Sequence, residues 1–119
     1  MNQVEVVYSL MNRLVADLNK RLPVSLVLHQ QQITTKNISL SGANGRVWVS
    51  PCQGGYDISI SGISLEKDMT ARLTSYFGRN PDGYKQRNAT QGFERQPFWR
   101  TSNFLNVETV CEMYANTTK

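Results

Sequence analysis

The N-terminal segment carries an apolar stripe with the spacing of a helix. The apolar positions recur at steps of three and four residues: Val4, Val7, Leu10, Met11, Leu14 and Leu18. This period places them on one helical face and predicts an amphipathic helix over residues 3–21. Pro23 ends the helix, because the residue before a proline is disfavoured in the helical region.

Short segments with the period of a strand follow the helix. Turn-forming residues separate the segments 24–29, 37–41, 46–50 and 56–61. Asn44 and Gly45 lie between the second and the third, and this dipeptide favours a tight hairpin because both residues tolerate positive φ. In the last segment Ile58 and Ile60 alternate with Asp57, which predicts an inward apolar face and an outward polar face. The pattern therefore predicts an antiparallel meander of three or four strands.

Two further helices are predicted in the C-terminal half. Residues 64–77 and 103–115 carry apolar stripes at helical spacing, and Gly78 is suited to end the first of these helices. A helix, a run of strands and two more helices are typical of an α+β fold, in which helices cover one face of an antiparallel sheet. A chain of 119 residues has the size of one domain. We therefore expect a single domain, 1–119.

The two C-terminal helices are separated by a segment, 79–101, that has no helical or strand period. A connection of that length inside a compact domain is uncommon, and it indicates a functional loop, a flexible loop or an unrecognised element. We expect a long loop. The alternative is a short projecting hairpin in which residues 84–87 pair with residues 93–96.

The net charge of the chain is concentrated around this loop. The formal net charge is +4, and residues 71–100 hold six basic and two acidic residues, so the rest of the chain is neutral. Six of the eleven aromatic residues lie in the same stretch. Basic side chains neutralise phosphates, and aromatic rings stack on unpaired bases. The sequence therefore predicts a non-enzymatic module that binds nucleic acid. The candidate contact residues are Arg79, Tyr84, Lys85, Arg87, Phe93, Arg95, Trp99 and Arg100.

The same residues fit other interpretations. Arg, Trp and Tyr are enriched at interface hot spots, so the loop can equally bind an acidic protein surface. In that alternative the chain is an inhibitor or adaptor, of the type made by phages and mobile elements, that acts on a nucleic-acid-processing or defence protein. Trp99, just before a predicted helix, can instead anchor the loop to the core. Val6 and Tyr8 lie off the main stripe of the first helix, which is compatible with a monomer or a homodimer.

Catalysis and metal binding have little support in the sequence. His29 is the only histidine, and the Cys-x-x-Cys spacing of many zinc sites does not occur. Cys52 lies in a glycine-rich turn, and a cysteine-dependent enzyme that uses Cys52 and His29 is a remote alternative. We expect no catalytic residues, no cofactor and no metal.

The composition is that of an ordinary globular protein, with 39% hydrophobic and 18% charged residues. The longest apolar run is too short to cross a membrane, and the N-terminus lacks the layout of a signal peptide. Two cysteines are too few for a disulfide framework. We therefore expect a cytoplasmic protein that does not contact a membrane.

Overall fold

The computed structural model describes residues 3–30, 38–43, 45–89 and 92–117, and for residues 30, 63–68, 86–89 and 92–95 it describes the backbone alone. Its elements are α1 (Gln3–Arg21), β1 (Val27–Gln30), β2 (Ile38–Ser41), β3 (Arg46–Cys52), β4 (Gly55–Ser61), α2 (Ile63–Phe77), β5 (Gly83–Ala89), β6 (Gly92–Thr101) and α3 (Phe104–Thr117). The described chain therefore has the α+β fold predicted from the sequence.

The strands form one antiparallel sheet in the order β1-β2-β3-β4-β6-β5. The first four strands are the predicted meander, in which each strand pairs with the next along the chain. After α2 the chain returns to the sheet, where β6 pairs with β4 and β5 pairs with the far side of β6. The sheet of the described chain therefore has six strands, and the prediction of three or four was too low.

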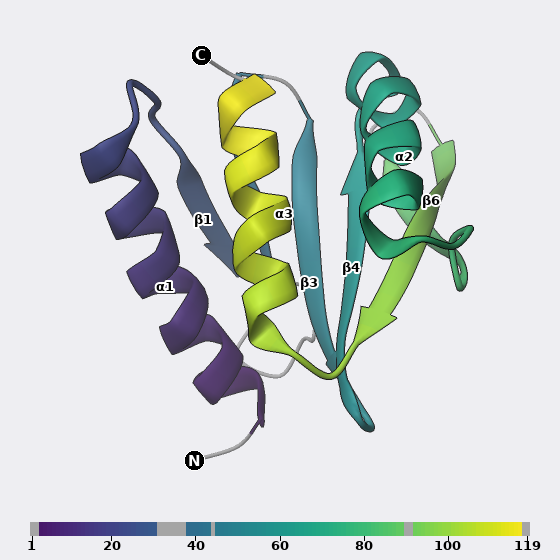
Figure 1. Ribbon diagram of the computed structural model, residues 1–119, viewed down its shortest axis with the longest axis horizontal. Helices are drawn as coiled ribbons and strands as arrows, with labels where there is room; N and C mark the ends of the chain where they lie inside the picture. Colours follow the sequence, from purple (N-terminus) through teal and green to yellow (C-terminus); the bar gives the residue numbers. More distant parts are fainter. Residues whose placement is uncertain (1–2, 31–37, 44, 90–91, 118–119) are drawn as a thin grey trace.

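The core lies between the sheet and the helices. Figure 1 shows α1, α2 and α3 on one face of the sheet. Ile58, Ile60 and Trp99 are fully buried, and they belong to one apolar cluster that includes residues of all three helices, such as Met11, Leu73 and Tyr114. The alternation predicted for 56–61 is therefore confirmed for its apolar residues.

The prediction of a loop over 79–101 is wrong for most of this segment, because the segment forms the hairpin β5–β6. The alternative pairing of 84–87 with 93–96 is close to the observed register, in which Lys85 pairs with Gln96 and Arg87 with Glu94. The strand signal was weak because β5 is polar along most of its sequence and lies at an edge of the sheet, where alternating apolar residues are not required. Gly78 ends α2 in the left-handed conformation, as predicted.

Candidate functional site

No helix of the described chain packs on the face of the sheet opposite the helices, which we call the open face. One cross-strand row of this face runs over all six strands. In strand order its residues are His29, Ser39, Trp48, Ser59, Phe98 and Gly83. The row therefore places residues that lie far apart in the sequence on one surface.

Two large rings, Trp48 and Phe98, dominate this row. They stand on β3 and β6 with Ser59 of β4 between them, so their backbones are roughly 10 Å apart at about 4.8 Å per strand. Both rings are half-buried, whereas Ser59 is fully buried beside them. In this row the small Ser59 therefore separates two large aromatic side chains.

Neighbouring residues hold both rings in place. The indole Nε1 of Trp48 donates to Ser61 Oγ at 3.0 Å. The Phe98 ring lies against Gly83, where an added Cβ would come within 2.7 Å of a ring carbon. Because Gly83 has no side chain, it leaves room for the Phe98 ring. A ring that covers a cross-strand glycine is a recognised way to stabilise an edge.

Each ring also carries at least one basic group. The Arg46 guanidinium carbon lies 5.6 Å from the centre of the Trp48 ring. Lys85 Nζ and the Arg100 guanidinium carbon lie 5.0 Å and 5.7 Å from the centre of the Phe98 ring. These distances are in the range of cation–π contacts. The open face therefore presents two ring–cation units. The first is Trp48 with Arg46, and the second is Phe98 with Lys85 and Arg100.

Asp57 of β4 lies beneath the second unit and binds both of its cations. Lys85 Nζ donates to Asp57 Oδ2 at 2.9 Å, while Arg100 donates through Nε to Oδ1 at 2.7 Å and through Nη2 to Oδ2 at 3.1 Å. Asp57 was predicted to face outward, and it does lie on the open face, but its side chain is only 2% exposed because the two long cations cover it.

The environment of Asp57 acts on its pKa in two directions. Burial by itself raises the pKa of Asp57, but the hydrogen bonds and charges of Arg100 and Lys85 outweigh it, so the pKa lies below its ordinary value. Asp57 is therefore ionised at neutral pH, and it offsets one of the two positive charges beside it.

The depressed pKa of Asp57 predicts a pH-dependent contribution to stability. The carboxyl has a lower pKa in the folded state than its value of about 3.9 in the unfolded chain, so the contribution is present above pH 4 and is lost as the pH falls through the folded pKa. We expect Asp57→Asn to lower the free energy of unfolding at pH 6 by about 1.5–3 kcal/mol, the scale of hydrogen bonds to charged groups. Urea unfolding from pH 6 down to pH 2 measures this difference, which should shrink toward zero at the acid end. A difference that stays constant with pH would contradict it.

The structure brings only part of the predicted site together. Lys85 and Arg100 meet on the open face, where both bind Asp57. Arg79 lies before β5 and binds Asp82 at 3.0 Å and the Arg100 carbonyl at 2.6 Å. Tyr84 pairs with Pro97 in the next register row and is 56% exposed. Arg79 and Tyr84 therefore do not join the ring–cation units.

The remaining predicted residues divide into one that is buried and three that are not described. Trp99 is fully buried in the core, where its ring stacks on Phe77 at 5.9 Å and its Nε1 donates to the Arg79 carbonyl at 3.1 Å. Trp99 thus has the anchoring position that the sequence also allowed. The side chains of Arg87, Phe93 and Arg95 lie outside the described residues.

Sequence reasoning missed Arg46, Trp48 and Phe98 as members of the site. The signal for the first two was present, because they alternate with Val47 and Val49 in a predicted strand and so belong to its polar face. Phe98 gave no such signal, since its strand was not recognised.

The structure separates the two residues of the remote cysteine-enzyme alternative. His29 Nε2 contacts Ser41 Oγ at 2.8 Å, and Cys52 Sγ donates to Asp57 Oδ1 at 3.6 Å. They stand two strands and four register positions apart, which is roughly 16 Å. Burial and the neighbouring Asp57 raise the pKa of the Cys52 thiol. Cys52 is therefore protonated at neutral pH and has no imidazole beside it.

Comparison with protein-family models, with curated proteins and with solved structures finds no match for this chain. Within the described ranges, His, Cys, Asp and Glu side chains form no group of three that could hold a metal ion. None of the described helices combines the length and apolar character that a membrane span requires. The chemistry of the open face is therefore the basis for a functional proposal.

Proposed function

We propose that the chain is a small non-enzymatic protein that binds single-stranded nucleic acid on the open face of its sheet. The observation that carries this proposal is the placement of Trp48 and Phe98 on one face that no described helix covers, each with a cation within 5.0–5.7 Å of its ring. The proposal keeps the ligand class predicted from the sequence and moves the contact surface from a loop to a sheet.

In this proposal the aromatic rings and the cations contact different parts of the nucleic acid. Unpaired bases stack on aromatic rings irrespective of their identity, and basic groups beside the rings contact the phosphates. Open antiparallel sheets with aromatic residues serve other proteins in this way. Bases within a duplex are already stacked on one another, so a surface built from rings favours a single strand.

The charge near the two rings determines how large an electrostatic contribution to the affinity for nucleic acid we expect. Among the described side chains around the two rings, Arg46, Lys85 and Arg100 contribute three positive charges and Asp57 contributes one negative charge, which leaves a local charge of +2. Neutralising about two phosphates of a single strand corresponds to a slope near −1.4 in a plot of log K against log salt concentration. Stacking is therefore expected to supply a large share of the affinity.

Fluorescence anisotropy tests the proposal with labelled oligo(dT), oligo(U) and a duplex of the same length, at salt concentrations from about 25 to 200 mM. We expect both single strands to bind more tightly than the duplex, with a slope between about −1 and −2. The proposal fails if no single strand binds at the lowest salt, or if the duplex binds more tightly.

The alternative function, an inhibitor or adaptor that binds an acidic surface of a nucleic-acid-processing or defence protein, uses the same cations. It differs in one result, because it requires no affinity for free nucleic acid. A failed anisotropy experiment together with a stoichiometric complex with an acidic protein would favour this alternative.

A further inference from the structure

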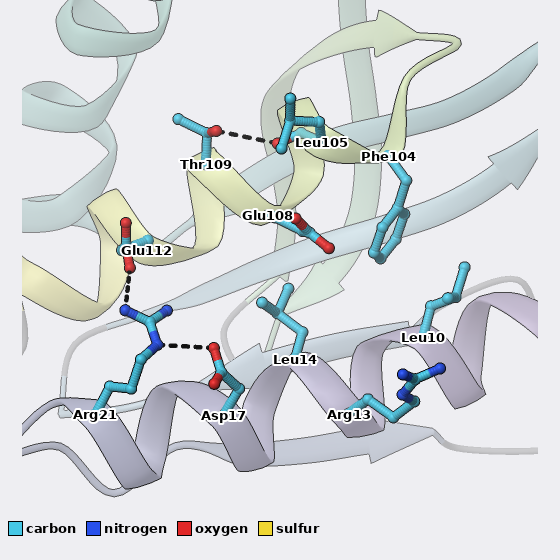
Figure 2. A pocket seen from close by; sticks show the side chains of 10 residues that line it. All are labelled: Leu10, Arg13, Leu14, Asp17, Arg21, Phe104, Leu105, Glu108, Thr109 and Glu112. Atoms are coloured by element: carbon cyan, nitrogen blue, oxygen red, sulfur yellow. Dashed lines mark hydrogen bonds and ion pairs between the residues drawn. The ribbon is translucent and has the colours of Figure 1, made fainter.

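A groove separates α1 and α3 on the outer side of the helical layer. Its volume is about 520 Å³, and Figure 2 shows residues of both helices lining it. Leu10 and Leu14 of α1 and Phe104 and Leu105 of α3 supply its apolar lining. This groove lies on the opposite side of the molecule from the ring–cation units, so it requires a separate explanation.

Within the described chain, the charged side chains that line the groove form ion pairs at one end of it, near the C-terminal ends of the two helices. Arg21 of α1 binds Asp17 and Glu112, each at 2.8 Å, and so links the two helices near their C-terminal ends. Further toward the N-terminal ends, Arg13 and Glu108 also line the groove, and neither forms an ion pair with another described residue. The groove thus carries one base on α1 and one acid on α3 that have no ion-pair partner in the described part of the chain.

Apolar side chains are exposed around the same end. Leu105 at the start of α3 is 60% exposed, and Val6, one helical turn before Leu10, is 41% exposed. One surface therefore holds both an exposed leucine, Leu105, and an apolar groove that could accept a side chain of that size. Exposed apolar groups that cluster in this way mark interaction sites.

We propose that a second copy of this chain occupies the groove in a symmetric homodimer. A two-fold axis parallel to the groove places α1 of one copy over α3 of the other. Arg13 then faces Glu108 of the second copy, and the same pair forms again on the other side of the axis. Leu105 of each copy enters the groove of the other. The surface is complementary to itself, as a two-fold interface requires, because Arg13 matches Glu108 and Leu105 matches the groove.

The proposed interface is modest in size. It packs four nearly aligned helices, the arrangement of a four-helix bundle. Because α1 is only about 28 Å long at 1.5 Å per residue, we expect an area at the lower end of specific interfaces and a dissociation constant in the micromolar range. The dimer is therefore expected to form at high protein concentration and to dissociate on dilution.

Sedimentation velocity over about 1–300 µM protein tests the proposal. The wild-type chain should shift from monomer to dimer within this range, and Leu105→Asp should stay monomeric throughout. Val27→Asp is the matched control, because Val27 is similarly exposed but lies on β1, and this variant should dimerise as the wild type does. Urea unfolding midpoints should show that both variants are folded.

Charge reversal tests the specific pairing. Arg13→Glu and Glu108→Arg, each alone, should weaken the dimer at least tenfold, because each places like charges opposite one another. The double variant should regain most of the wild-type affinity. The proposal is overturned if the wild type is monomeric at about 300 µM, if Leu105→Asp dimerises normally, or if the double variant is as weak as the single ones. A monomeric wild type that binds an added amphipathic helical peptide in the groove would also overturn it, in favour of a different partner.

Discussion

Replacing Trp99 with alanine is expected to lower the free energy of unfolding by about 3–5 kcal/mol, the range for deleting a large buried aromatic side chain. Trp99 is fully buried, stacks on Phe77 of α2 and pairs in the sheet with Ile58 of β4. Its Nε1 also holds the carbonyl of Arg79 at 3.1 Å, so the substitution removes a hydrogen bond from the connection between α2 and β5. A domain of this size has a total stability of about 5–15 kcal/mol, so a measurable fraction of the variant should be unfolded at the upper end of this effect.

Urea unfolding followed by far-ultraviolet circular dichroism measures this effect. The matched control is Trp48→Ala, because Trp48 is only half-buried on the open face and its loss should cost clearly less. A loss below about 1 kcal/mol for Trp99→Ala would mean that Trp99 is not the anchor of the hairpin on the core.

Replacing Trp48 with alanine is expected to weaken binding to single-stranded nucleic acid about 5- to 100-fold, because base stacking on an aromatic ring is worth about 1–3 kcal/mol. Trp48 lies in the middle of the open face with the Arg46 guanidinium over its ring. Its removal deletes the stacking surface of one unit and leaves Lys85, Arg100 and Phe98 of the other unit in place. Anisotropy titration with oligo(dT) measures the change.

Trp48→Phe separates stacking from a structural role. Both substitutions remove the Nε1 hydrogen bond to Ser61, but only alanine removes the ring. Phenylalanine should therefore restore most of the affinity without restoring that bond. Equal losses of affinity in the two variants would show that the hydrogen bond or the fold is responsible, and that Trp48 does not stack on a base.

Periodicity predicted the parts of the fold that pack on the core. Residues 3–21 and 56–61 carry regular apolar positions because one side of each faces the same buried layer, and both elements were predicted at nearly their observed bounds. The hairpin β5–β6 was expected as a loop, because β5 is an edge strand with the polar run Lys85-Gln-Arg-Asn and packing does not impose a period on it. Among the described side chains of β6, Trp99 packs in the core, near the C-terminal end of the strand.

The site was predicted only in part. The candidate residues were all taken from one continuous segment, 79–100, whereas the residues of the open face come from several strands that lie far apart in the sequence. Phe98 and Trp99 are adjacent in the chain, yet one lies on the open face and the other in the core, since successive strand residues point to opposite sides. Trp99 was selected and Phe98 was not. Lys85 and Arg100 were selected, but their shared partner Asp57 lies in a different strand and could be paired with them only once the sheet order was known.

The location of the binding surface is the central claim, and nuclear magnetic resonance mapping tests it most directly. The ¹⁵N-labelled protein would be titrated with oligo(dT) at low salt while backbone amide and indole N–H signals are followed. We predict that the largest shifts occur at Trp48, including its indole, and around Ser59, Phe98 and Arg100, with little change in α1 and α3. Shifts confined to the helical layer, or the absence of any shift at saturating oligonucleotide, would contradict the account.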